Sequence, residues 1–476
     1  VVLTTGTYMD SCRMVSATVT PGGPDNEPTT KNLSESLRKL GIKLFRLKTG
    51  TPARVLTSSI DFSKTSLEEG SKRFIRFSED TKEDEVRSVA EQMPCYLTYT
   101  TEKTKEIVLA NLNKSSMYSG VVKGVGPRYC PSFEDKIVRF SDKERHQLFL
   151  EPLDATNELT YVQGFSTSMP YDVQEEMVHS VIGLENCEIV KYAYAIEYDA
   201  IDPLQVKASL EMKDIDGLFI GGQILGTSGY EEAAGLGMMA GINALRKLNN
   251  KEPLVLKRDE AYIGVMIDDL VTKGTNEPYR LLTSRAEYRL LMRHDNAENR
   301  LIKYGHENGL ISEERYQRYL SKQDQMSSLV TYLKNSKVDY STGIGEYLNS
   351  LGFKEDDTKS FNAYELVKRP GVECSEVLKF LGNDSYDDEI VFNTQIEIRY
   401  QGYIQKARKE ADKMLKMDGM KLPQDIDYSK VDNLRLEARQ KLNQVKPFTL
   451  GQASRISGIN PADLNVLAVY IKEHKI

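Results

Sequence analysis

Two short apolar segments that each end in glycine restrict the fold of this chain more than any other feature. Residues 1–6 read V-V-L-T-T-G, and residues 218–223 read L-F-I-G-G-Q, with a helical pattern over residues 231–245. Apolar runs without polar alternation are typical of strands buried on both faces, as in parallel sheets. Ligands of doubly wound folds bind at the ends of such strands. The sequence therefore predicts an α/β, Rossmann-like domain with both segments in its parallel sheet.

The second segment also predicts a ligand contact. Gly222 would let a ligand approach the backbone closely, and Gln223 adds a polar side chain, so both are candidate cofactor contacts. The helix that follows would direct its N-terminal N–H groups toward an anion or the edge of a reduced flavin. Gly235, Gly237 and Gly241 fall inside this helix, where close packing against the sheet is the better interpretation.

These two strand ends are two of the three marks of flavoproteins with two dinucleotide-binding domains. The third mark, G-x-G-x-x-G after the first strand, does not occur in the 476 residues, and the chain starts at Val1 inside a strand pattern. We therefore expect an N-terminal part of the FAD-binding domain to precede this sequence. We also expect the chain by itself to bind FAD poorly, which stoichiometric flavin in the purified chain would contradict.

Residues 126–140 carry the most specific chemical signal, G-P-R-Y-C-P-S-F-E-D-K-I-V-R-F. Pro127 and Pro131 would hold Cys130 in a stiff, non-helical segment. Arg128 beside the sulfur would favour the thiolate, which is the reactive form, and Lys136 follows six residues after the cysteine. A buried cysteine in a proline-rich loop explains the pattern equally well when the segment is considered alone.

Composition excludes several classes of protein. No apolar run is long enough for a membrane span, and five scattered cysteines without C-x-x-C spacing argue against zinc and for reduced thiols in a cytosol. The net charge is −7, yet residues 391–476 hold 15 Lys and Arg against 10 Asp and Glu. A basic end on an acidic chain is compatible with RNA binding, although a solvated helix face gives the same count.

Arginines in the C-terminal half are candidate contacts to RNA phosphates. Arg285, Arg289 and Arg293 are spaced by four residues, which would place them on one helix face. Arg399 adjoins two tyrosines, and Arg455 lies in a helix-turn-helix-like pattern over residues 449–474. Ion pairing on a solvated face remains an alternative for the first three.

Changes in the amino-acid pattern along the chain predict five domains or parts of domains. We expect an FAD-binding domain (first part) at 1–54, an inserted α+β subdomain at 55–125, the remaining FAD/NAD-binding domain at 126–262, a helical domain at 263–390, and a C-terminal helical subdomain for tRNA and partner binding at 391–476.

Several long motifs closely resemble the MnmG (GidA) family of tRNA-modifying flavoproteins, from one end of the chain to the other. They are R-L-K-T-G-T-P (46–52), P-C-Y-L-T (94–98), the 126–140 segment, A-I-E-Y-D (195–199), G-Q-I-L-G-T-S-G-Y-E-E-A-A (222–234), Y-I-G-V-M-I-D-D-L (262–270), E-P-Y-R-L-L-T-S-R-A-E-Y-R-L (277–290) and G-Q-A-S-R-I-S-G (451–458).

The resemblance implies an enzyme that modifies C5 of the wobble uridine of tRNA. FAD would be reduced by NADH, methylenetetrahydrofolate would supply the carbon, and glycine or ammonium would supply the nitrogen. A cytoplasmic homodimer acting with the GTPase MnmE is implied as well.

The family also assigns roles to residues of this sequence. Its nucleotide-binding segment matches residues 126–140, its flavin-contacting glutamine matches Gln223, and a flavin-contacting serine falls at Thr30. Cys130 matches one of two functional cysteines, with Arg128 and Lys136 as expected catalytic partners. The expected cofactor contacts are Gly126, Pro127, Arg128, Tyr129, Thr30, Lys48, Gly222 and Gln223.

Two alternatives stay open beside this interpretation. The related folate- and FAD-dependent tRNA uridine methyltransferases share the flavin fold, but the helical end with G-Q-A-S-R-I-S-G argues against them. A non-catalytic scaffold that binds RNA or a GTPase is disfavoured by the proline-flanked Cys130. The sequence departs from the family at Leu225 and at Gly235–Leu236, close to the expected flavin contacts.

Overall fold

The computed structural model describes residues 1–71, 77–126, 131–354, 360–423 and 425–473. The described chain forms two compact units: unit 1 comprises residues 1–255 and 266–281, and unit 2 comprises residues 256–265 and 282–476. The expected change from α/β to helical texture near residue 262 therefore lies close to the division between the units.

The two glycine-ended segments of unit 1, both expected in a parallel sheet, pair with each other. β1 (Val2–Leu3) lies parallel to β12 (Phe219–Ile220). The other strand pairs in the described residues are antiparallel. Val1 and Val2 are exposed, so the expectation that this strand is buried is wrong at its start. The predicted helix is α5 (Tyr230–Leu248).

The backbone of α5 lies close to the glycine that follows β12. A Cβ atom at Gly221 would lie 3.0 Å from Cα of Gly237 and 3.2 Å from the carbonyl oxygen of Leu236, so a larger residue at 221 would push α5 away from the strand. A Cβ atom at Gly237 or Gly241 would meet no atom within 4 Å. The close approach therefore requires glycine at 221, and the packing interpretation of the helix glycines stays a prediction.

Two antiparallel sheets form the rest of unit 1. The four-stranded sheet has the order β3-β2-β11-β4, formed by β3 (Thr18–Pro21), β2 (Cys12–Val15), β11 (Tyr194–Ile201) and β4 (Leu44–Thr51). The six-stranded sheet has the order β10-β5-β9-β8-β7-β6, formed by β10 (Ile189–Lys191), β5 (Arg54–Leu56), β9 (Leu159–Gln163), β8 (Gln147–Pro152), β7 (Cys95–Tyr99) and β6 (Ser66–Glu68).

The six-stranded sheet differs from the predicted division at residue 125. β7 and β8 pair directly with each other, although the predicted boundary separates them. The amino-acid pattern of a strand is a local property, whereas membership of a sheet depends on pairing between distant segments. The pattern does not show which strands pair. α2 (Glu102–Ala110), α3 (Phe133–Arg139) and α4 (Tyr171–His179) accompany this sheet, and Phe133, Leu148, Val162 and Met177 belong to its buried core.

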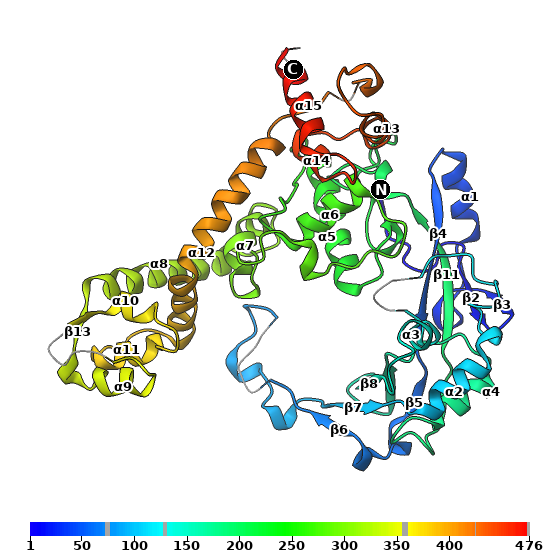
Figure 1. Ribbon diagram of the computed structural model, residues 1–476, viewed down its shortest axis with the longest axis horizontal. Coiled ribbons are helices and arrows are strands. Elements are labelled where there is room, and N and C mark those ends of the chain that lie inside the picture. Colours follow the sequence, from blue (N-terminus) through cyan, green and yellow to red (C-terminus); the bar gives the residue numbers. More distant parts are fainter. Residues whose placement is uncertain (72–76, 127–130, 355–359, 424, 474–476) are drawn as a thin grey trace. The chain divides into compact units, whose positions relative to one another are not determined.

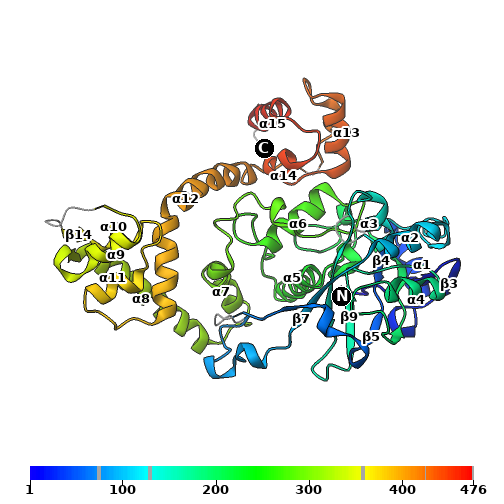
Figure 2. The same ribbon diagram turned by 60° about the horizontal axis from the view of Figure 1, so that its bottom comes forward.

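Unit 2 is helical, as the sequence predicts. α12 (Asp388–Asp418) is its longest helix, and two groups of helices lie near its two ends (Figures 1 and 2). The first group is α8 (Glu313–Asn335), α9 (Ile344–Ser350), α10 (Ala363–Val367) and α11 (Cys374–Phe380), and the second is α13 (Leu436–Val445), α14 (Leu450–Arg455) and α15 (Pro461–Glu473). None of the helices in the described ranges is long and apolar enough to cross a membrane.

The predicted helical arginine face over residues 285–293 is wrong. The chain here forms a single short 3-10 turn, Thr283–Arg285, and Ala286 is extended with φ −96° and ψ 124°. The buried guanidinium of Arg258 donates to the carbonyl oxygen of Arg285 at 3.3 Å and pairs with Glu287 at 2.7 Å. An α-helix would give that carbonyl oxygen to an N–H four residues later, so the contacts of Arg258 stabilise the extended form.

Candidate active site

Two of the expected cofactor residues, Lys48 and Gly126, line one pocket of unit 1. The pocket has a volume of about 420 Å³. Its walls come from β4, from residues 117–126 and from α3 with the residues before it. The lining residues are Lys48, Met117, Gly124, Val125, Gly126, Pro131, Ser132, Asp135, Arg139 and Glu277. Strands and a helix far apart in sequence thus meet where the sequence predicts nucleotide binding.

Glu197 holds the segment that leads into this pocket. Its Oε1 accepts hydrogen bonds from the backbone N–H groups of Lys123 and Gly124, both at 2.5 Å. The backbone N–H of Lys48 donates to the carbonyl oxygen of Val125 at 3.0 Å. A Cβ atom at Gly124 would lie 2.9 Å from the backbone of Leu47, so this approach requires glycine.

The carboxylate of Glu197 belongs to a buried network of charges. Arg46 on β4 pairs with Glu197 at 3.4 Å and with Asp199 at 3.1 Å, and Arg38 pairs with Asp199 at 2.7 Å. Burial by itself would lower the pKa of Arg46, but hydrogen bonding to Asp199 and the neighbouring negative charges outweigh it and raise that pKa. Because both carboxylates are nearly inaccessible, the two arginines compensate their charge and keep the sheet in register.

α3 is anchored on the other side of the pocket by Glu134. This side chain is fully buried, and its Oε1 accepts hydrogen bonds from Ser115 Oγ at 2.8 Å, Thr167 Oγ1 at 2.9 Å and the N–H of Ser168 at 3.1 Å. Ser132 caps the helix by accepting a hydrogen bond from the N–H of Asp135. The end of the predicted nucleotide-binding segment is therefore fixed by a polar cluster that no sequence motif indicated.

The expected catalytic residues fall only partly within the described structure. Pro127, Arg128, Tyr129 and Cys130 lie outside the described residues. Lys136 is half-buried on α3 and donates from Nζ to the carbonyl oxygen of Gly164 at 2.8 Å. This contact gives Lys136 a role in attaching α3 to the strand end after β9, whereas its role in catalysis stays a prediction.

Charged groups of both signs face the pocket. Lys48 and Arg139 are cationic, and Asp135 and Glu277 are anionic. Asp135 also accepts a hydrogen bond from Tyr118 Oη at 3.0 Å. Burial, together with the charge and hydrogen bond of Asp135, raises the pKa of Tyr118 to about 12, so this phenol remains a donor at neutral pH. The pocket therefore offers both donors and acceptors to a polar ligand.

The expected flavin contacts at the end of β12 are held in defined positions. Gly222 has φ 79° and ψ −159°, and a Cβ atom there would meet only one atom, a carbonyl oxygen at 3.9 Å, so space for a ligand lies beside its backbone. Gln223 Nε2 donates to Oη of the fully buried Tyr198 at 2.9 Å. Burial raises the pKa of Tyr198 to about 12 against the opposing effect of Gln223.

Two other expectations near this site are modified by the structure. The N-terminus of α5 is occupied by the protein's own Glu232, because a Cβ atom at Gly229 would overlap Oε2 of that carboxylate. The anion at this helix end is therefore the carboxylate of Glu232 and not an external ligand. Thr30 is exposed at the start of α1 (Lys31–Lys39), and its hydroxyl donates to the carbonyl oxygen of Tyr8 at 3.0 Å.

Three of the five candidate RNA-binding arginines are held by acceptors of unit 2 itself. Arg293 pairs with Asp295 and Glu397, Arg399 donates to the carbonyl oxygens of Val367 and Val372 and pairs with Glu373, and Arg455 pairs with Asp418. The side chain of Arg455 is 8% exposed. Arg285 is half-buried, and Arg289 is exposed.

A cationic helix face on α12 was missed by the sequence reasoning. Lys406, Lys409, Lys413 and Lys416 are exposed and spaced by three or four residues, which places them on one side of the helix. None of them is in an ion pair with a residue that the structure describes. Tyr403, one turn earlier, is 65% exposed. The spacing was readable from the sequence, but only the structure shows which cations are free.

Comparisons with known proteins agree over nearly the whole chain. Residues 1–252 match the sequence model described as glucose inhibited division protein A. Residues 313–408 and 410–476 match the first helical domain and the C-terminal helical bundle of the tRNA modifying enzyme MnmG/GidA. The border between these two matches falls inside α12.

Relatives and solved structures give the same result. Proteins named tRNA uridine 5-carboxymethylaminomethyl modification enzyme MnmG are 50% identical to this chain in Listeria innocua, over 100% of this chain and 75% of the relative, and 50% identical in Mycoplasma mycoides, over 99% and 75%. A structure of Aquifex aeolicus GidA superimposes with a TM-score of 0.87 at 42% identity, covering 99% of this chain and 74% of that chain. The chain therefore belongs to the MnmG/GidA family of tRNA-modifying enzymes.

Proposed function

We propose that this protein catalyses the 5-carboxymethylaminomethyl modification of the wobble uridine of tRNA. The observation that carries the proposal is the 50% identity, over the whole chain, to proteins named for this modification. The pocket lined by Lys48 and Gly126 supports it, because the nucleotide-binding segment implied by the family resemblance begins at that pocket.

FAD is the cofactor we propose for the end of β12. The residues present fit a flavin, since Gly222 leaves room beside its backbone and Gln223 presents a side-chain amide fixed by Tyr198. When bound, FAD would supply the redox chemistry of the reaction, with NADH as the reductant. The carbon would come from methylenetetrahydrofolate and the nitrogen from glycine or ammonium.

NADH is the ligand we propose for the 126–140 segment. Gly126 borders the pocket, and the buried Lys48 with Arg139 provides positive charge for a pyrophosphate. Asp135 and Glu277 provide acceptors suited to ribose hydroxyls. Pro127, Arg128, Tyr129 and Cys130 complete the proposed segment, with Cys130 acting on the uridine.

For tRNA we propose the lysine face of α12 as the principal contact. Its four lysines are exposed and have no ion-pair partner among the described residues. Arg293, Arg399 and Arg455, by contrast, pair with carboxylates of unit 2. A phosphate needs a cation that is not already neutralised. The GTPase MnmE and a second copy of the chain are the proposed protein partners.

The replacement Cys130→Ser tests the proposal against its alternatives. The full-length protein is incubated with tRNA, FAD, NADH, methylenetetrahydrofolate, glycine and an MnmE-type GTPase, and the digested nucleosides are measured by mass spectrometry. We expect 5-carboxymethylaminomethyluridine from the wild type, none from C130S, and unchanged tRNA binding by C130S. 5-Methyluridine as the product would favour the methyltransferase, and no product with intact tRNA binding would favour the scaffold.

A further inference from the structure

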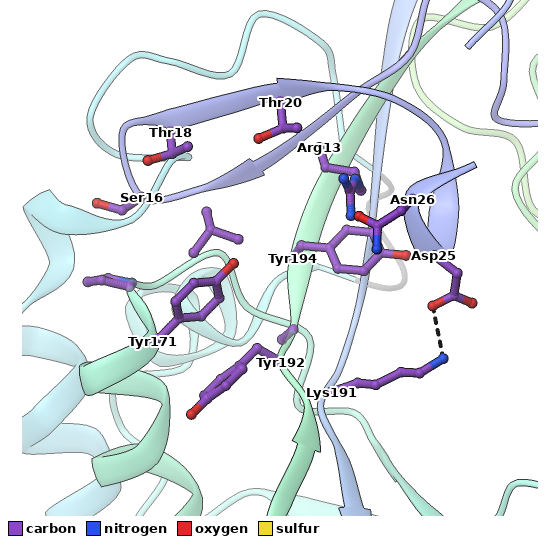
Figure 3. Close-up of a pocket in the computed structure, with 13 residues that line it drawn as sticks. Arg13, Ser16, Thr18, Thr20, Asp25, Asn26, Tyr171, Lys191, Tyr192 and Tyr194 are labelled. Atoms are coloured by element: carbon purple, nitrogen blue, oxygen red, sulfur yellow. Dashed lines mark hydrogen bonds and ion pairs between the residues drawn. The ribbon is translucent and has the colours of Figure 1, made fainter. Parts of the chain in front are cut away.

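A second pocket of unit 1 lies beside the β2–β3 hairpin and takes no part in the proposed chemistry. It has a volume of about 550 Å³, within the range of about 300–1,000 Å³ typical of small-molecule sites. Its walls are the hairpin, the residues that follow β3, the start of α4 and residues 191–194 before and at the start of β11 (Figure 3).

One of the two positive charges in the pocket has no carboxylate partner in the described part of the chain. Lys191 pairs with Asp25 at 3.1 Å, so these two charges compensate each other. Arg13 on β2 forms no ion pair with any residue that the structure describes, and its Nε is buried without a hydrogen-bond partner. Its guanidinium carbon lies 6.0 Å from the centre of the Tyr194 ring. Figure 3 shows the two side chains beside each other. A partly exposed guanidinium without a carboxylate partner among the described residues can pair with an anionic ligand that enters the pocket.

Aromatic rings form the opposite side of the pocket. Tyr171 and Tyr192 contact each other with ring centres 4.6 Å apart, and Tyr171 is 54% exposed. Figure 3 shows the Tyr171 ring pointing toward the hairpin and the Tyr192 ring pointing away from it. Because a base has a π-face, exposed tyrosines of this kind can stack on it without regard to sequence.

Hydroxyl and amide groups line the mouth. Thr18, Thr20 and Asn26 are exposed, and Ser16 lies next to them on the hairpin. Exposed polar groups at a rim suit a ligand that continues outward as a chain, since such a ligand remains partly in solvent. They also offer hydrogen bonds to ribose hydroxyls and base edges.

We propose that this pocket binds one unstacked nucleotide of the RNA substrate, with its phosphate on Arg13 and its base against Tyr171. The inference rests on the proposed function for its choice of RNA. The pocket adjoins the candidate active site through one short segment: Ser116 Oγ donates to the carbonyl oxygen of Ser16, and the next residue, Met117, lines the Lys48 pocket. A nucleotide held here is thus placed beside the site where its neighbour reacts.

The salt dependence of RNA binding tests the phosphate contact. The probe is a fluorescein-labelled anticodon stem-loop with uridine at the wobble position, titrated with the full chain by anisotropy at several salt concentrations. Loss of one contact to a single strand should reduce the slope of log K against log salt by about 0.7 in Arg13→Gln, with binding roughly tenfold weaker. Arg13→Lys should restore the slope because it restores the charge.

Two further variants separate binding from folding. Tyr171→Leu should weaken binding roughly tenfold without altering the slope, because stacking is not electrostatic. Lys39→Gln is the matched control: it removes one positive charge from the exposed Lys39–Glu35 pair on α1 and should behave as wild type. Circular dichroism melts verify that all variants are folded.

Three results would overturn the inference. Arg13→Gln could match Lys39→Gln in both slope and affinity, or Tyr171→Leu could bind the RNA as wild type does. In a parallel titration with pteroylglutamate, Arg13→Gln could weaken binding of that carboxylate ligand and leave RNA unaffected. Uridine modification is assayed separately, so a chain that binds RNA through Arg13 but forms no product would refute the proposed function alone.

Discussion

Removal of the lysine face of α12 should abolish most of the electrostatic affinity for tRNA. The perturbation replaces Lys406, Lys409, Lys413 and Lys416 with glutamine. These four residues are exposed and have no ion-pair partner among the described residues, so each is available to a phosphate. Lysine and glutamine have similar helix propensities, so α12 should stay folded.

The size of the effect follows from the number of contacts. Lys406 and Lys416 are 10 positions apart on the helix, or about 15 Å at 1.5 Å per residue, which matches the rise of about four nucleotides. Each contact to single-stranded RNA contributes about 0.7 to the salt slope, so four contribute about 2.8. At 0.1 M salt this corresponds to about 1 kcal/mol per contact, or roughly a thousandfold in affinity for all four.

The assay is filter binding of radiolabelled tRNA between about 50 and 200 mM salt, the interval over which phosphate-dominated binding changes most. A matched control removes four other lysines of unit 2, each already paired with a carboxylate. They are Lys303, Lys368, Lys379 and Lys430. Both variants change the net charge by the same amount. If the lysine face of α12 contacts the tRNA, only the variant that lacks this face should show a large loss of affinity. Equal slopes in the two variants would refute the reasoning, because net charge would then explain the affinity.

Three other changes should affect stability. Burial alone would raise the pKa of Glu211, but hydrogen bonds from Lys247, Gly217 and Lys207 lower that pKa to about 2. The ionised carboxylate should therefore contribute up to about 3 kcal/mol to the free energy of unfolding above pH 4.5, and this contribution should disappear as the pH falls toward 2. In Glu211→Gln, the melting temperature should lose this dependence on pH. Glu134→Ala removes the acceptor of three buried hydrogen bonds and should cost about 2–4 kcal/mol in urea unfolding, and a loss below 1 kcal/mol would contradict the anchoring role. Arg455→Gln breaks a nearly buried pair with Asp418 and should destabilise unit 2 by about 1–3 kcal/mol, whereas an altered tRNA salt slope without destabilisation would show that Arg455 contacts RNA instead.

Local features of the structure were predicted well from local sequence. Leu33, Leu37 and Leu40 have helical spacing and Gly41 follows them, which predicts a helix over residues 32–40; the structure has α1 at Lys31–Lys39, and Gly41 has φ 83°. Asn460 followed by Pro461 predicts a helix start, and Oδ1 of Asn460 accepts a hydrogen bond from the N–H of Asp463 in α15 at 2.9 Å. Such helix ends depend on residues within one turn of each other, so the necessary information is contiguous in the chain.

The candidate site was predicted in part for the same reason. Lys48 and Gly126, both expected to contact a cofactor, line the same pocket, and cofactor binding by them stays a prediction. The roles of Pro127, Arg128, Tyr129 and Cys130 stay predictions, as do those of Thr30, Gly222 and Gln223. Glu134 and Glu197 were not singled out, because their importance arises from hydrogen bonds to segments 19 to 74 residues away.

The sequence by itself determined the class of fold, the helical C-terminal region and the family, because these follow from periodicity and from long contiguous motifs. Only the tertiary structure decided which charges are available to a ligand. Arg293, Arg455, Lys406 and Lys413 are all basic side chains whose availability the sequence does not show. In the structure the two arginines form ion pairs with carboxylates from distant segments, and the two lysines form none with the described residues. The same holds for Arg13 and Lys191 in the second pocket, where only Lys191 has an ion-pair partner among the residues that the structure describes. Whether a cation is neutralised depends on what the fold brings within a few ångströms of it, and spacing along the chain does not contain that information.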